Sequence, residues 1–246
     1  MGLRIIQTEK PLKDKAVIAL RDRLREGGVV SGRPGAVGDV RDIVAGIIKG
    51  VKDGGDAFVV KHTNDFHKVN FTPETLRVSR QDIQSAFTAA DPEFLELARR
   101  VMANIRQYQR SIRVESPPPL RRGGRELSVR YTPITRVAIY VPGAKAVYPS
   151  SLLMTAVPAM VAGVKEIAMV SPPTVDGDIH PMLLSLAGEL GIDEVYRTDG
   201  VAGLAALACG TETVRPVAKI CGPGNAFIAE TKRQLFGQVG IDSIAG

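Results

Sequence analysis

Few residues of this 246-residue sequence have the side chains that acid–base, metal or thiol chemistry needs. Its three histidines are His62, His67 and His180, and its two cysteines are Cys209 and Cys221. His62 and His67 are five positions apart, a spacing that does not place both on one face of a helix. A zinc site needs three or four converging ligands, and a catalytic cysteine needs a nearby base. The sequence shows neither pattern, so we predict surface or capping histidines, buried structural thiols, and no catalytic or metal-binding residue.

Two glycine-containing loops have a composition suited to ligand binding. They read "YVPGAKAVYPSS" (140–151) and "GPGN" (222–225). Glycines let backbone N–H groups approach a ligand, and a helix N-terminus favours a negative group such as a pyrophosphate. Neither loop contains the G-x-G-x-x-G dinucleotide motif. The residues alone leave two interpretations of "GPGN", a tight turn followed by a helix cap or an anion- or nucleotide-binding site.

The second half of the chain alternates between strand and helix patterns. The segments 136–141, 166–171, 193–198 and 217–222 have strand patterns, and helical patterns at 150–163, 178–190, 201–210 and 225–237 separate and follow them. This alternation predicts a parallel sheet flanked by helices, an α/β fold. In such sheets ligands bind beyond the carboxyl ends of the strands, which is where both loops lie.

The first half has helical periodicity. Apolar residues recur at the 3.6-residue period over 40–51, a helix that we expect to open at Asp39 and to close near Gly54. Ser79 and the Asp91-Pro92 pair have the types found at helix N-termini. The predicted organisation is a helical N-terminal part of an incomplete first domain (1–114), a connector and edge strand (115–133), a Rossmann-like α/β domain (134–238) and a truncated lead-in to a missing half (239–246).

Composition and charge narrow the class of protein. With 44% hydrophobic and 24% charged residues the chain is globular, and no stretch approaches the roughly 18 uninterrupted apolar residues of a membrane span. The N-terminus has no secretory signal pattern, so a cytoplasmic location is expected. Residues 1–133 carry 24 Lys and Arg against 16 Asp and Glu, whereas residues 134–246 carry 8 against 10. Because only 5% of residues are aromatic, the basic half favours a solvated or partner-facing surface over a nucleic-acid site.

Several segments together resemble histidinol dehydrogenase. They are "YVPGAKAVYPSSLLMTAVPAMVAGVKEIAMVSPP", "GIDEVYR", "AALACGTETV" and "KICGPGNAFIAETKRQLFGQVGIDSIAG", with "VKDGGDAF" in the helical half. The resemblance covers nearly the whole chain but only about the first half of the family's length. It implies an NAD- and zinc-dependent enzyme of histidine biosynthesis that oxidises L-histidinol to L-histidine in two NAD-linked steps.

The resemblance also implies part of an NAD site. Family contacts carry over to Tyr140 and Asn225, and Pro142 and Gly143 shape the first loop. Two positions depart from the family pattern: Ala202 in "DGVAG" (199–203) replaces a glutamine, and Ala144 replaces a glycine. We therefore expect a weak or partial NAD site. The zinc ligands and the Glu–His pair that moves protons are implied to lie beyond residue 246.

These observations lead to one prediction and two alternatives. The chain is predicted to be the N-terminal portion of a histidinol dehydrogenase, inactive as an isolated chain. The first alternative is a non-catalytic nucleotide-binding or oligomerisation module derived from that family, and the second is a nucleic-acid-associated protein that uses the basic half. We expect the faces of helices 40–51 and 94–108 to pack on a sheet outside this sequence, and therefore to favour a homo-oligomer or association with the missing C-terminal half.

Overall fold

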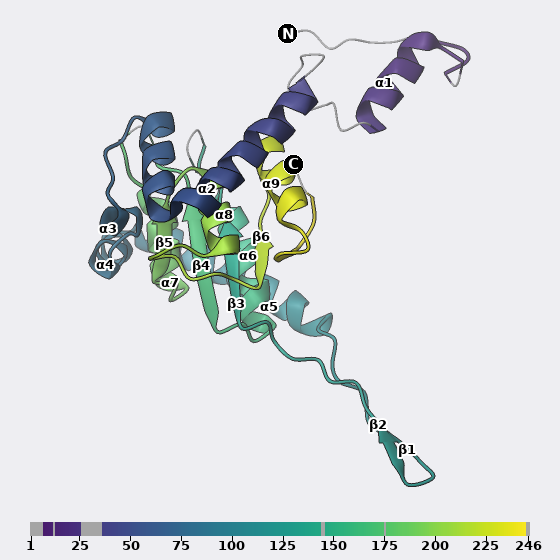
Figure 1. Cartoon of the computed structure of the whole chain (residues 1–246). Coiled ribbons are helices and arrows are strands. Elements are labelled where there is room, and N and C mark those ends of the chain that lie inside the picture. The colour runs from purple at the N-terminus through teal and green to yellow at the C-terminus, as the bar shows by residue number, and fades with distance from the viewer. Residues whose placement is uncertain (1–6, 12, 26–35, 144–145, 175, 245–246) are drawn as a thin grey trace.

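A five-stranded parallel sheet forms the centre of the molecule (Figure 1). The computed structural model describes residues 7–11, 13–25, 36–143, 146–174 and 176–244. The strands are β3 (Arg136–Tyr140), β4 (Glu166–Ser171), β5 (Glu194–Arg197), β6 (Lys219–Cys221) and β7 (Gly240–Ile241), in the order β5-β4-β3-β6-β7. All neighbouring strands are parallel. The predicted α/β fold with a Rossmann-like sheet is confirmed.

The order of the strands defines a crevice at the middle of the sheet. The chain enters at β3, moves outward through β4 and β5, and then returns to place β6 on the other side of β3. Connections on the two sides of this point run in opposite directions, so the loops that leave β3 and β6 diverge at their carboxyl ends. These are the two loops that the sequence singled out. Because β7 pairs with β6, part of segment 239–246 belongs to the same sheet.

Helices cover both faces of the sheet. The crossover helices are α6 (Pro149–Val161), α7 (Pro181–Glu189) and α8 (Gly200–Cys209), and α9 (Ala226–Leu235) follows β6. Successive side chains of a strand point to opposite faces. Accordingly, Ala138 and Tyr140 belong to the core beneath α8 and α9, whereas Ile139 and Val141 belong to the core beneath α6 and α7.

The N-terminal half is helical, as the periodicity indicates. Its helices are α1 (Lys15–Arg25), α2 (Ala36–His67), α3 (Pro73–Leu76), α4 (Arg80–Thr88) and α5 (Pro92–Ser111). The Ser79 side chain accepts from the Asp82 N–H at 3.0 Å and that of Asp91 from the Glu93 N–H at 2.9 Å, which confirms both caps. Asp39 is not a cap, because α2 begins at Ala36. The expected break is real: Gly55 adopts φ 53°, outside the helical region.

Helices α2 and α5 pack on the helices that flank this chain's own sheet, α2 on α8 and α9 and α5 on α6 and α7. Val44, Ile48 and Val51 of α2 join the core of α8 and α9, and Ala98 and Met102 of α5 join the core of α6 and α7. The expectation that these faces await a sheet outside the sequence is therefore wrong for their buried residues. Helices α2, α4 and α5 thus form an outer layer over the helices that flank the sheet. Other apolar side chains of the two helices, among them Ile43 and Leu97, remain exposed.

The connector forms an extended arm. Strands β1 (Leu120–Arg122) and β2 (Arg125–Leu127) pair antiparallel with each other, and neither joins the five-stranded sheet. Gly123 and Gly124 both have positive φ, as a two-residue hairpin turn with matching twist requires. Every residue from 111 to 135 is exposed, and Figure 1 shows the hairpin projecting away from the helices and the sheet. The expected edge strand is thus part of a separate hairpin. Among the described residues, no helix is both long and apolar enough to cross a membrane.

Candidate functional site

A cavity of about 470 Å³ opens at the carboxyl ends of the central strands. This volume is in the range of small-molecule sites. Tyr140, Pro142, Gly143 and Asn225, the four predicted site residues, all line it. The structure thus brings the two loops together, while their contact with NAD stays a prediction. Ala144 lies outside the described residues.

Two glycines allow the loops to approach each other and the strands. A Cβ on Gly222, whose φ is 120°, would lie 2.3 Å from the Tyr140 carbonyl oxygen, so only glycine permits this contact between β6 and β3. A Cβ on Gly143 would lie 2.6 Å from the Ser171 Oγ at the end of β4. Because neither glycine has a side chain, the two loops lie close to the strands at the base of the cavity.

A buried lysine holds the turn after β6. Lys232 of α9 is fully buried, and its Nζ donates to the Gly222 carbonyl and, at 2.7 Å, to Asp242 Oδ1. The Gly222 N–H donates to Asp242 Oδ2 at 2.8 Å. Burial raises the pKa of the Asp242 carboxyl, but its hydrogen bonds with Lys232 and two backbone N–H groups lower it to below its usual value overall. This carboxylate therefore stays ionised and fixes the "GPGN" turn.

Asn225 caps α9 beside the cavity. Its Oδ1 accepts from the N–H groups of Phe227 at 3.0 Å and Ile228 at 3.2 Å. The tight-turn and helix-cap interpretation of "GPGN" is confirmed, and it does not exclude the second interpretation. Because the cap is a neutral amide, the positive end of the α9 dipole remains uncompensated by a charged side chain.

Asp199 caps α8 on the other side of the cavity. Its Oδ1 accepts from Val201 N–H at 3.0 Å and Ala202 N–H at 3.1 Å. A carboxylate therefore occupies this helix N-terminus, in contrast to α9. Ala202 itself is fully buried in the core, so its methyl group lies beneath the cavity rather than in its wall.

His62 and His67 converge on Asp199, which the sequence did not indicate. His62 Nε2 lies 3.4 Å from Asp199 Oδ1, and His67 Nε2 lies 4.0 Å from Oδ2. Both histidines line the cavity and are largely buried. The prediction that they are surface or capping residues is wrong, because packing α2 against α8 brings the end of α2 to the N-terminus of α8. His180 does cap a helix: its Nδ1 accepts from the Met182 N–H at 3.2 Å.

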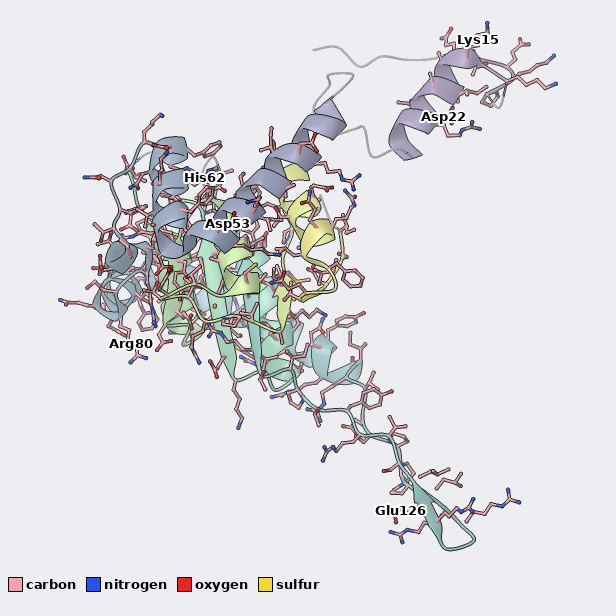
Figure 2. All side chains as sticks on the ribbon, in the orientation of Figure 1. Lys15, Asp22, Asp53, His62, Arg80 and Glu126 are labelled. Atoms are coloured by element: carbon pink, nitrogen blue, oxygen red, sulfur yellow. The ribbon has the colours of Figure 1, made fainter. Side chains whose placement is uncertain are left out.

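Aromatic neighbours set the position of His62. Its ring is stacked between Phe58 and Phe66, with ring planes 6° and 16° from parallel. These three residues recur every four positions on the second segment of α2, where Figure 2 labels His62. The stripe was the only sequence signal for this site. Taken alone, an i, i+4 aromatic stripe indicates packing and says nothing of Asp199.

Burial and charge act on the ionisable groups of the site. Burial raises the pKa of Asp199, but the contact with His62, the Ala202 N–H and the two imidazoles lower it below its usual value overall. Burial lowers the pKa of His67 against the opposing effect of Asp199. Burial and the Asp199 charge raise the pKa of Tyr140 to about 12. At neutral pH the cavity therefore holds an aspartate anion, a neutral His67 and a protonated tyrosine.

Comparison with known proteins identifies the relatives of this chain. The family model described as histidinol dehydrogenase matches residues 33–246. The chain belongs to the histidinol dehydrogenase family. It is 45% identical over 206 residues to histidinol dehydrogenase of Geobacillus kaustophilus, covering 84% of this chain and 48% of the relative. With the Moorella thermoacetica enzyme it shares 43% identity over 222 residues, covering 90% and 51%.

A solved structure shows the same fold. The crystal structure of histidinol dehydrogenase from Elizabethkingia anophelis matches with a TM-score of 0.79 and 28% identity, covering 88% of this chain and 49% of that one. The chain spans about half the length of the curated relatives it matches. The predicted membership of this family, with a match to about half of the relatives' length, is confirmed.

The described part of this family member does not fit a zinc site. No group of three or more His, Cys, Asp or Glu side chains within it is arranged to hold a metal ion. The prediction that both thiols are buried is wrong, because Cys209 and Cys221 are each only partly buried. Cys209 and Cys221 each pack against a hydrophobic core, and burial together with the Asp242 charge raises the pKa of the Cys221 thiol.

Proposed function

We propose that this chain is the N-terminal portion of an NAD- and zinc-dependent histidinol dehydrogenase that oxidises L-histidinol to L-histidine in the cytoplasm. The observation that carries the proposal is the cavity at the switch point between β3 and β6. In a member of this family, it gathers Tyr140, Pro142, Gly143 and Asn225 around one space. NAD supplies the hydride acceptor, and this half supplies part of its binding site.

The two helix N-termini divide the cavity electrostatically. The α8 end carries the Asp199 carboxylate, which repels phosphate, whereas the α9 end has only the neutral Asn225 cap. A dinucleotide pyrophosphate therefore fits at α9, where the helix dipole favours an anion. Tyr140 and the apolar wall, which includes Phe227 and Ile228, exclude water from the uncharged parts of the ligand.

Catalysis needs groups that this half does not provide. The cavity residues bind and orient a nucleotide, while the described residues form no zinc site. We therefore expect the isolated chain to show no turnover, and to gain it with a complementary C-terminal half. The assay mixes this chain with a separately produced C-terminal half of the Geobacillus relative and follows NADH formation with L-histidinol. No activity from a mixture that forms a stable complex would contradict the proposal.

Binding of NAD⁺ is tested with Asn225→Asp in a calorimetric titration. Aspartate caps a helix as well as asparagine does, so the fold is kept, but its charge opposes a pyrophosphate at α9. NAD⁺ affinity should fall by at least about tenfold, the effect of roughly 1.4 kcal/mol. The matched control is Asn104→Asp on the exposed surface of α5, which should leave affinity unchanged. Equal effects of both variants would contradict phosphate binding at α9.

The exposed arm supports a second candidate role, association with another chain. Residues 111–135 are exposed throughout, and they include large apolar side chains, namely Leu120, Leu127, Val129 and Tyr131. Such side chains gathered on a projecting arm favour contact with a partner. Light scattering should show a dimer or larger species. A monomer at all concentrations would contradict association through the arm and would leave the proposed nucleotide binding unaffected.

A further inference from the structure

One buried polar atom at the base of the cavity, His67 Nε2, makes no hydrogen bond with the described residues. Asp199 Oδ1 accepts two backbone N–H groups and lies 3.4 Å from His62 Nε2. Asp199 Oδ2 lies 4.0 Å from His67 Nε2. Buried polar atoms are normally hydrogen-bonded, and one left unpaired costs about 1–3 kcal/mol. His67 Nε2 and Asp199 Oδ2 therefore offer a place for one further polar group.

The distance between His67 Nε2 and Asp199 Oδ2 determines which chemical group fits between them. A distance of 4.0 Å is too long for a direct hydrogen bond. One oxygen atom between them can nevertheless lie about 2.8 Å from each, an ordinary hydrogen-bond length. The anionic Asp199 favours the tautomer of His67 with its proton on Nε2, the nitrogen nearer the carboxylate. A hydroxyl then satisfies both atoms, because it donates to Asp199 and accepts from His67.

Other groups satisfy the pair less well. A phosphate oxygen cannot donate and is repelled by the Asp199 charge, an ammonium group cannot accept from His67, and a methyl group leaves both atoms unpaired. His62 acts as a positioning residue. Its stacked ring contacts Oδ1 and so leaves Oδ2 directed toward His67.

The surroundings indicate what kind of molecule carries the hydroxyl. The cavity walls are mostly aromatic and aliphatic, with Phe66, Tyr148 and Phe227 among them. Such walls suit a planar base, and an acidic side chain at the carboxyl end of a strand is a general means of binding a ribose hydroxyl in nucleotide-binding sheets. Asp199 follows β5 in this way.

We propose that Asp199 and His67 form a sugar-binding position that holds a free ribose hydroxyl of a nucleoside or dinucleotide and rejects a phosphate at that hydroxyl. The proposal rests on the nucleotide-binding role proposed above and names a specificity-determining pair for it. The pair makes the cavity select NAD⁺ over a dinucleotide that carries a phosphate on this ribose. Asp199 at the N-terminus of α8 then binds the sugar, and the uncharged N-terminus of α9 binds the pyrophosphate.

The test compares ligands that differ at one hydroxyl. Adenosine, 2′-deoxyadenosine and 3′-deoxyadenosine are titrated calorimetrically into the native chain in the presence of EDTA. At least one deoxynucleoside should bind about tenfold or more weakly than adenosine, the size expected for a lost hydrogen bond to a charged group. Adenosine carrying a phosphate on the same hydroxyl should bind more weakly still.

Two variants test whether Asp199 and His67 cause this difference in affinity between adenosine and the deoxynucleosides. Asp199→Asn keeps an oxygen for the α8 cap, and His67→Phe removes the ring nitrogens. Each should weaken adenosine by about tenfold and abolish discrimination against the deoxynucleoside. Asp193→Asn is the matched control, because Asp193 precedes the opposite end of β5 and is half exposed. It should change neither affinity nor discrimination.

Three results would overturn the proposal: equal binding of adenosine and both deoxynucleosides, unchanged discrimination in both variants, or no nucleoside binding at millimolar concentration. Binding that appears only with added Zn²⁺ would also overturn it, because the side chains would then be metal ligands. NAD⁺ binding that responds to Asn225→Asp but not to Asp199→Asn would remove the sugar-binding pair alone. Adenosine binding through Asp199 without any NAD⁺ binding would remove the proposed dehydrogenase role alone.

Discussion

The buried carboxylates at the amino ends of the sheet have cations beside them, as Asp242 does after β7, whereas Asp199 at the carboxyl ends has none. At the amino ends, Arg136 of β3 donates to Glu194 of β5 at 2.6 and 2.5 Å and to Glu166 of β4 at 3.3 Å. Glu194 also accepts from the Tyr196 hydroxyl at 2.8 Å, and Arg215 donates to Glu166 at 2.6 Å. At the carboxyl ends, Asp199 accepts from two backbone N–H groups, and the ionisable side chains beside it are the two imidazole rings, at 3.4 and 4.0 Å.

This difference separates a structural cluster from a binding site. Burial raises the pKa of Glu194, but Arg136 and Tyr196 lower it overall, so every carboxylate at the amino ends has a cation beside it. Each end keeps a buried nitrogen without a hydrogen-bond partner among the described residues, Arg136 Nε at the amino ends and the neutral His67 Nε2 at the carboxyl ends, but only His67 lies beside an anion that has no cation. Unsatisfied and perturbed groups that border a cavity are characteristic of functional sites, where stability is given up for binding.

The largest expected effect comes from breaking the amino-end cluster. Arg136→Met leaves the buried Glu194 without its cation, and removal of one partner of a buried pair costs about 3–5 kcal/mol. The free energy of unfolding in urea measures this loss. Arg121→Met, which breaks an exposed pair with Glu126 on the hairpin (Figure 2), should change it little. Adding Glu194→Leu to Arg136→Met should recover part of the loss, and no recovery would contradict the unpaired charge as its cause.

An intermediate effect is expected from crowding the carboxyl ends. Gly222 and Gly237 both have positive φ, but only a Cβ on Gly222 meets another atom, the Tyr140 carbonyl. Gly237→Ala should cost about 1–2 kcal/mol from backbone strain alone. Gly222→Ala should cost about 1–3 kcal/mol more from the clash, and should weaken NAD⁺ binding because the two loops move apart. Equal losses of stability would show that the approach of β6 to β3 is not tight.

The smallest effect is a pH dependence at the carboxyl ends. Burial lowers the pKa of His67, which faces Asp199 of α8 and His62 of its own helix, so the unfolded chain binds a proton more readily than the folded chain. His67 therefore makes its full contribution to the free energy of unfolding above its unfolded pKa of about 6.5. This contribution is lost as the pH falls through the pKa of the folded state. Between pH 7.5 and 5, the free energy of unfolding should decrease more steeply for the native chain than for His67→Gln. Parallel curves would contradict the direction of this shift.

Local sequence patterns predicted much of the fold. The apolar runs located four of the five strands to within two residues, because a buried parallel strand needs a short continuous apolar segment. Ser79 and Asp91-Pro92 located helix starts, since a cap depends on neighbours within one turn. Asp39 shows the limit of this reasoning: a residue of a suitable type is a cap only if the helix begins there, and α2 begins three residues earlier.

What the sequence alone determined is the family, the α/β class and the two loops that meet at the cavity. Each depends on residues that are close together in the chain, or on the parallel arrangement that alternating strands and helices predict. Only the tertiary structure showed that α2 lies on α8 and that His62, His67 and Asp199 therefore meet. Both histidines are more than 130 positions from Asp199 in the chain, and no local pattern links them to it. Their contact depends on how two apolar helix faces pack, which is a property of the whole core.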